Sequence, residues 1–109
     1  MERHIFLVGM PGSGKSALGR RVALKLQTPY LDTDAYLTEI SGMNTAQLFE
    51  TYGEQAFRDG ETRLLCDLIC ATPGIISTGG GTALRPENRQ LMRTHGFVVL
   101  IDRPIDDIL

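Results

Sequence analysis

The stretch GMPGSGKS, residues 9–16, decides the fold of this 109-residue chain. It matches the pattern G-x-x-x-x-G-K-[ST] at every fixed position. The apolar, β-branched and aromatic run at residues 4–8 precedes it and is typical of a buried strand, while apolar residues recur at helical spacing over 15–26. A glycine-rich turn between a strand and a helix is the context in which this pattern forms a phosphate-binding P-loop.

Each residue type in the stretch has a physical task. Glycines permit positive φ angles that turn successive backbone N–H groups inward, and the helix beginning at Lys15 adds the positive end of its dipole. Lys15 would reach the β- and γ-phosphates of ATP as a catalytic residue, and the Ser16 hydroxyl would ligate Mg²⁺ as the cofactor. We therefore predict a site that binds ATP through Gly12, Ser13, Gly14, Lys15, Ser16 and Ala17.

A second glycine pattern overlaps the first. Gly12, Gly14 and Ala17 also satisfy the weaker dinucleotide-binding pattern G-x-G-x-x-A, with an acidic residue further along the chain. That pattern should begin directly at the end of the strand, whereas residues 9–11 intervene here. The wider spacing favours the P-loop.

Composition narrows the function classes. The length suits one domain, and a formal net charge of -2 leaves no basic face for a nucleic-acid backbone. The first apolar run is too short for a membrane span or a signal-peptide core and meets glycine at once. We therefore expect no nucleic-acid or membrane partner and a cytoplasmic location.

The two cysteines, Cys66 and Cys70, stand at i, i+4 spacing on one side of a predicted helix. They could supply half of a metal site, but a second pair is missing from the sequence and His4 and His95 are distant in it. We interpret the cysteines as buried structural thiols and the histidines as structural or surface residues.

Further elements follow in alternation. The pattern predicts strands at 30–32, 75–78 and 97–101. It predicts a long helix over about 54–71 and a helix from Pro86 to about 93. Between 34 and 58 it predicts short helical pieces, with Asn44 or Thr45 as an N-cap. Alternating strands and helices predict an α/β fold with a parallel sheet and ligands at the carboxyl ends of its strands. The continuous apolar run 97–101 predicts a central strand covered on both faces.

Four further segments carry a family resemblance. They are the acidic pair in DTD (32–34), Phe49, the segment GEQAFR (53–58) with Glu61, and STGGG (77–81). In this order, together with the P-loop, they resemble the shikimate kinases. Two neighbouring carboxylates could equally form an ordinary helix N-cap with Asp34 as the cap.

The resemblance implies a three-layer α/β/α P-loop kinase that transfers the γ-phosphoryl group of ATP to the 3-hydroxyl of shikimate, in aromatic amino-acid biosynthesis. Asp32 would support the Mg²⁺ site with Ser16, and Asp34 would contact the substrate hydroxyls and accept the attacking proton. Arg58 would grip the shikimate carboxylate. Glu61 would either hold Arg58 in place or form a weak surface pair with it. The glycines Gly79, Gly80 and Gly81 would let backbone N–H groups approach the substrate, although a merely flexible loop is the plain alternative.

The resemblance also sets the expected layout. Residues 1–109 would form one domain, with a core at 1–32 and 62–109 and a substrate-binding insertion at 33–61. We expect a monomer, with a partner subunit as the alternative. Shikimate kinases continue beyond the position of Leu109 into a lid, an adenine-contacting loop and a last strand, so the chain is expected to be incomplete at its C-terminus. Gly60 is unexpected within a helix, where it costs about 1 kcal/mol relative to alanine.

Two other functions remain open from the sequence. Another small-metabolite P-loop kinase, such as one acting on gluconate, would also meet a carboxylate and several hydroxyls. A nucleotide-binding module without turnover would use the P-loop alone.

Overall fold

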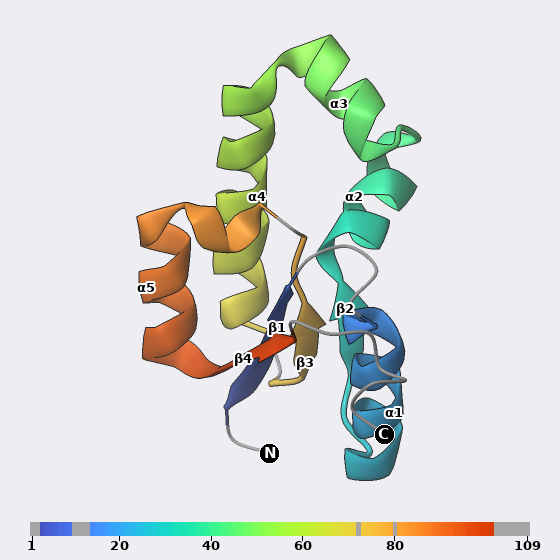
Figure 1. The fold of residues 1–109 in the computed structure, drawn as a ribbon, viewed down its shortest axis with the longest axis vertical. Helices are drawn as coiled ribbons and strands as arrows, with labels where there is room; N and C mark the ends of the chain where they lie inside the picture. The colour runs from blue at the N-terminus through green and yellow to red at the C-terminus, as the bar shows by residue number, and fades with distance from the viewer. Residues whose placement is uncertain (1–2, 10–13, 72, 80, 102–109) are drawn as a thin grey trace.

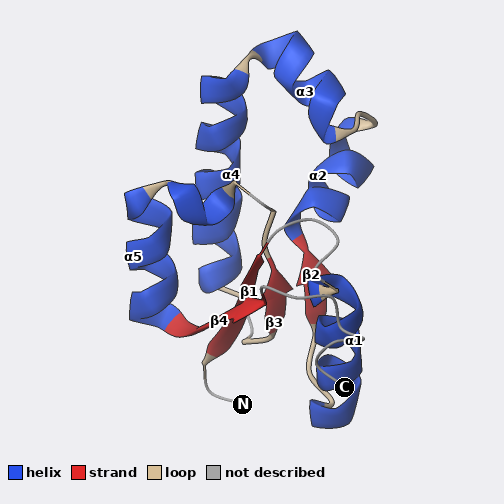
Figure 2. Ribbon diagram, viewed as in Figure 1, coloured by secondary structure: helices blue, strands red, loops and turns tan. Residues whose placement is uncertain are grey.

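The computed structural model describes residues 3–9, 14–71, 73–79 and 81–101. Strands and helices alternate along most of the chain, as predicted (Figures 1 and 2). In chain order they are β1 (His4–Gly9), α1 (Lys15–Leu26), β2 (Tyr30–Asp32), α2 (Thr33–Ser41), α3 (Thr45–Tyr52), α4 (Glu54–Ile69), β3 (Ile75–Ser77), the short 3₁₀ helix η1 (Thr82–Leu84), α5 (Pro86–His95) and β4 (Gly96–Ile101). Only η1 lacks a counterpart among the predicted elements.

The sheet has the order β2-β3-β1-β4, and all its described pairings are parallel. Phe6 of β1 lies opposite Ile76 of β3 on one side and Val98 of β4 on the other, and Leu31 of β2 lies opposite Ile76. The carboxyl ends of the strands therefore meet at one edge. The predicted parallel α/β sheet is confirmed.

Side chains of β1 alternate between two cores. On one face, Phe6 and Val8 pack with Leu65 of α4 and Met92 of α5. On the other face, Leu7 packs with Ala23 of α1. The period of two along the strand thus places α4 and α5 on one side and α1 on the other, which makes the three-layer arrangement.

The segment between β2 and α4 forms short helices beyond the sheet, α2 and α3, seen at the top of Figure 1. Asn44 caps α3: its side chain accepts from the Gln47 backbone, and the Gln47 side chain accepts from the Asn44 backbone. This reciprocal pair is a capping box and selects Asn44 over Thr45. Gly42 and Gly53 end α2 and α3 at positive φ angles of 73° and 88°, which explains the glycines at these breaks.

One predicted environment is wrong. β4 lies at the edge of the sheet, and Phe97 and Leu100 are 59% and 66% exposed. The apolar run therefore does not mark a central strand within the described part of the chain. Burial depends on the neighbouring elements, and a run of apolar residues does not reveal which neighbours are present.

The cysteines are also not buried, because both Cys66 and Cys70 are exposed. The buried side of α4 carries Phe57, Glu61 and Leu65, spaced four residues apart. Each cysteine is one residue beyond a position in this four-residue spacing, and one residue turns the helix by about 100°, away from the buried side. His4 is buried and His95 is exposed. None of the helices in the described ranges combines the length and apolar character that a bilayer-spanning segment needs.

Two helix glycines give opposite predictions for the same substitution. A Cβ at Gly60 would have no heavy atom within 4 Å, whereas one at Gly19 would lie 2.6 Å from Tyr30 Cε1 and 2.9 Å from Leu7 Cδ1. Gly60→Ala should raise the free energy of unfolding by about 0.5–1 kcal/mol through helix propensity. Gly19→Ala should lower it by about 1–3 kcal/mol through overpacking. Urea unfolding of both variants would check this, and a loss of stability at Gly60 would contradict it.

Candidate functional site

The site lies at the carboxyl edge of the sheet, where β1 leads into the P-loop segment. Gly14 adopts a left-handed conformation (φ 86°, ψ 8°) as the N-cap of α1, which begins at Lys15. The predicted residues Gly12, Ser13 and Gly80 lie outside the described residues. The described end of the motif thus presents the first turn of α1, with its free N–H groups and positive dipole end, at this edge.

Ser16 and Asp32 come from different elements and meet directly. The Ser16 hydroxyl donates to Asp32 Oδ2 at 2.7 Å, and Asp32 Oδ1 accepts from the Ala35 N–H at 3.1 Å. Asp32, rather than Asp34, is therefore the N-cap of α2, so the alternative of Asp34 as an ordinary cap is wrong. The cap fixes the Asp32 carboxylate and turns Asp34 into the first turn of the helix.

These two side chains offer the oxygen ligands that Mg²⁺ prefers. Because Ser16 donates its proton to Asp32, the lone pairs of its oxygen stay available for a cation. Mg²⁺ keeps several waters and needs only one or two protein groups. Among the described residues, no group of three His, Cys, Asp or Glu side chains could hold a metal ion. The Ser16–Asp32 pair has the ligand chemistry that a hydrated Mg²⁺ would accept.

Thr33 joins the ends of β2 and β3. It is 5% exposed, and its hydroxyl accepts from the Gly79 N–H at 3.0 Å. Asp34 lies against the same glycine, since a Cβ on Gly79 would come 2.9 Å from the Asp34 carboxyl carbon. Glycine at position 79 is therefore needed for Asp34 to pack against this backbone.

Burial raises the pKa of the Asp34 carboxyl above its usual value, and the negative charges of Asp32 and Glu61 add to the rise. The positive charges of Lys15 and Arg58 oppose it. Asp34 is thus a partly desolvated carboxylate among four charged side chains. A raised pKa makes a carboxylate a better proton acceptor from a neighbouring hydroxyl.

Arg58 is held on several sides. Its Nη1 donates to Glu61 at 2.7 Å, and its guanidinium carbon lies 5.2 Å and 5.4 Å from the ring centroids of Phe49 and Phe57. A Cβ on Gly81 would come 2.5 Å from the same guanidinium carbon. With 23% of its side chain exposed, Arg58 is an ordered group and not a freely solvated arginine.

Glu61 is buried, with 4% of the residue exposed. One carboxylate oxygen accepts from Arg58 and the other accepts from the Thr82 hydroxyl at 2.9 Å. Of the two interpretations of this pair, the weak surface pair is wrong and the positioning contact holds. Asn88 extends the network, because its side chain donates to the Thr82 carbonyl and accepts from Thr62.

The structure brings most of the predicted residues to one edge. Lys15, Ser16, Asp32, Asp34, Arg58, Gly79 and Gly81 gather there, while Ala17 is exposed on α1. The sequence assigned no role to Thr33, Thr82 or the rings of Phe49 and Phe57. Both phenylalanines stand in the segments that carry the resemblance, whereas for the threonines the signal was position: Thr33 stands between the two aspartates and Thr82 directly follows the glycines.

A family model described as "Shikimate kinase" matches residues 11–109. Among curated proteins, the shikimate kinase of Rhodopseudomonas palustris is 39% identical over 108 residues, covering 99% of this chain and 53% of that protein. The enzyme of Nitrobacter winogradskyi is 46% identical over 107 residues, covering 98% of this chain and 50% of that protein. The chain spans about half the length of the curated relatives it matches.

Solved structures agree with the fold. A structure described as shikimate kinase from Acinetobacter baumannii in complex with shikimate has a TM-score of 0.87 and 34% identity, covering 95% of this chain and 58% of that chain. The shikimate kinase of Aquifex aeolicus gives a TM-score of 0.86 and 35% identity, covering 96% and 62%. With the matching family model and the relatives in agreement, this chain belongs to the shikimate kinase family.

Proposed function

We propose that the protein is a shikimate kinase that transfers the γ-phosphoryl group of ATP to the 3-hydroxyl of shikimate. The observation that carries the proposal is the placement of Asp34 and Arg58 against one glycine segment, beside Lys15. Asp34, which can accept a proton, and Arg58, which can bind the carboxylate of a substrate, thus lie near the end of the P-loop. The Acinetobacter relative, whose structure contains shikimate, supports the substrate.

The phosphate side uses the P-loop residues. Backbone N–H groups of residues 12–17 would hold the ATP phosphates, with Lys15 as the charge at the β- and γ-phosphates. Ser16 and Asp32 would hold Mg²⁺, which neutralises phosphate charge when bound. We further propose a cytoplasmic monomer without a nucleic-acid or membrane partner.

The acceptor side uses the segment 33–61, which we propose as the substrate-binding insertion, together with Gly79, Gly80 and Gly81. Arg58 would bind the shikimate carboxylate through N–H groups that Glu61 leaves free, since a guanidinium carries five donors. Asp34 would accept the proton of the 3-hydroxyl as its oxygen bonds to the γ-phosphorus. The bond from that phosphorus to the oxygen of ADP breaks, giving ADP and shikimate 3-phosphate.

A coupled ADP-release assay of the protein at its full natural length tests this function. Shikimate should support turnover in the presence of Mg²⁺, and gluconate should not. Lys15→Ala should remove most of the turnover and weaken the binding of ATP at least about tenfold, because charged hydrogen bonds are worth roughly 1.5–3 kcal/mol each. Lys25→Ala, the other lysine at the far end of α1, is the matched control. Binding of ATP without turnover on any acceptor would favour the non-catalytic module, and preference for gluconate would favour the other kinase.

Arg58→Lys separates the substrate from the nucleotide. Lysine keeps the charge beside Glu61 but loses the planar fork, so the KM for shikimate should rise by roughly tenfold or more while that for ATP changes little. Arg85→Lys is a suitable control because Arg85 pairs with Asp59 and Glu87 instead. Equal weakening of both substrates by Arg58→Lys would make Arg58 structural.

Asp34→Asn should lower kcat by about 10²–10⁴, the usual contribution of a positioned general base. It should also stabilise the ligand-free protein at pH 7. Burial raises the pKa of Asp34 in the folded state above its value in the unfolded state. The contribution of Asp34 to stability is therefore fully present below the unfolded-state pKa and is lost as the pH rises through the folded-state pKa. Asparagine does not ionise, so the variant does not lose this stability at neutral pH.

The stability gain should therefore shrink as the pH is lowered toward the unfolded pKa of aspartate. Thermal melts of Asp34→Asn and of the exposed-site control Asp67→Asn, recorded from pH 4 to pH 7 without ligands, would check the sign. A variant less stable than the parent at pH 7 would contradict the desolvation argument.

A further inference from the structure

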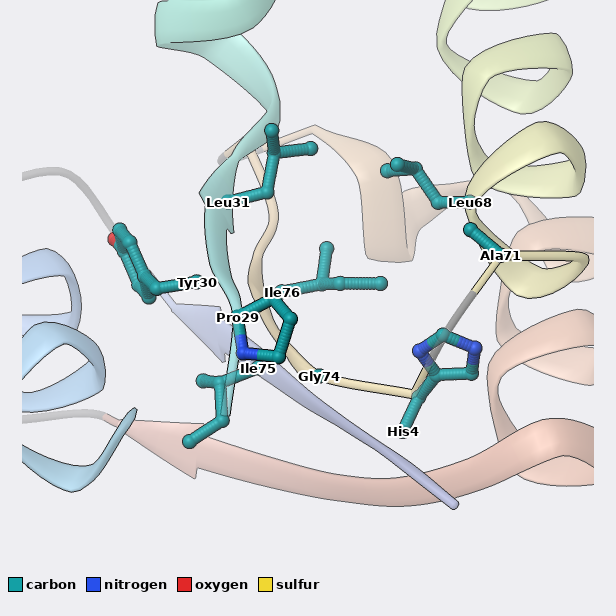
Figure 3. A pocket seen from close by; sticks show the side chains of 9 residues that line it. All are labelled: His4, Pro29, Tyr30, Leu31, Leu68, Ala71, Gly74, Ile75 and Ile76. Atoms are coloured by element: carbon teal, nitrogen blue, oxygen red, sulfur yellow. The ribbon is translucent and has the colours of Figure 1, made fainter. Parts of the chain in front are cut away.

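A second pocket opens at the opposite edge of the sheet, where the strands begin. It has a volume of about 270 Å³. Its walls include His4 of β1, Leu31 of β2, Ile76 of β3 and Leu68 of α4 (Figure 3). The phosphate-side residues Asp32 and Gly79 stand at or beyond the other ends of β2 and β3.

His4 supplies the pocket with one defined polar atom. The residue is 4% exposed, and its Nε2 lies 3.2 Å from the Ile69 carbonyl oxygen. A carbonyl only accepts, so Nε2 carries the proton and donates. In the neutral ring the other nitrogen, Nδ1, is then an acceptor.

Nδ1 is buried and has no hydrogen-bond partner among the described residues. Figure 3 shows a ring nitrogen of His4 on the side that faces Ile76 and the pocket. A buried acceptor without a partner costs free energy, because folding removes its water. An occupant that donates one hydrogen bond would recover that loss.

The other lining side chains limit what else the occupant can carry. Leu31, Leu68, Ile76 and the neighbouring Pro29 and Ala71 are apolar, and the Tyr30 hydroxyl is turned away from them in Figure 3. No lysine or arginine lines the described pocket, so an anion would lose hydration without gaining a counter-charge. The volume lies near the low end for ligand sites, which run from roughly 300 Å³ upward.

We propose that this pocket binds a neutral, mostly apolar molecule of one ring or two fused rings that carries a single N–H or O–H donor. The donor bonds to His4 Nδ1 and the ring packs between Leu31, Leu68 and Ile76. Such a ligand would contact β2 and β3, the strands that carry Asp32 and lead to Gly79. The site goes beyond the proposed kinase function and does not rest on it.

Indole and benzothiophene are matched probes, because the two rings have nearly the same shape and only indole carries an N–H. Titration of the ¹⁵N-labelled protein with each should shift backbone resonances around Leu68 and Ile76. Indole should bind roughly three- to tenfold more tightly, the usual worth of one neutral hydrogen bond. Equal affinities, or shifts that map elsewhere, would overturn the proposal.

Two variants sharpen the test. His4→Phe keeps a planar ring but has no acceptor atom, so it should reduce indole to about the affinity of benzothiophene and leave benzothiophene nearly unchanged. Ala71→Leu fills the pocket and should weaken both probes, whereas Cys70→Leu places a leucine at an exposed neighbour outside the pocket and should weaken neither. If His4→Phe fails to fold, the comparison of the two probes on the parent protein still decides. Indole binding unaffected by Ala71→Leu would overturn the assignment to this pocket.

Discussion

The parallel pairing of β1 with β3 is the constraint on which the rest of the structure depends. Phe6 opposite Ile76 and Leu7 opposite Ser77 fix which side chains face each helical layer. The ladder continues past the strand, where the Thr78 N–H and hydroxyl both bond to the Leu7 carbonyl at 2.9 Å and 3.0 Å. A slip of one residue would move Phe6 and Val8 out of their core and displace Gly79 from Thr33 and Asp34. One register thus sets both the cores and the site.

Much of this arrangement could be predicted from the sequence because its signals are local. The Asn44 cap and the helical spacing of α1 each depend on a few neighbouring residues, and the structure has both where expected. The exposure of Phe97 to Leu100 could not be predicted, since it depends on which elements lie beside β4. The exposed cysteines were misjudged for a similar reason, because i, i+4 spacing shows that two residues share a side of a helix and not which side is covered.

Within the site, the sequence indicated the charged residues but not what holds them. Asp32 and Asp34 stand two positions apart in the chain, and capping gives them different tasks: Asp32 is bound by Ser16 and the Ala35 N–H, while Asp34 is turned toward Gly79. The two aspartates differ because Asp32 is the N-cap of α2 and Asp34 lies in its first turn. A sequence motif does not contain this information. Gly79 and Gly81 likewise looked like candidates for backbone contact with a substrate, and the structure adds that a Cβ at either would collide with Asp34 or Arg58.

Arg58 contributes to the stability of the fold and is also a residue of the candidate site. Glu61 is almost fully buried, and its carboxylate is satisfied by Arg58 and Thr82, which Asn88 in turn holds from α5. Removing one partner of a buried ion pair costs about 3–5 kcal/mol, because the remaining charge stays desolvated. That cost is a large part of the 5–15 kcal/mol by which a typical domain is stable. An uncharged residue at position 58 would therefore disturb the packing of α4 against η1 as well as the substrate binding that we propose for Arg58.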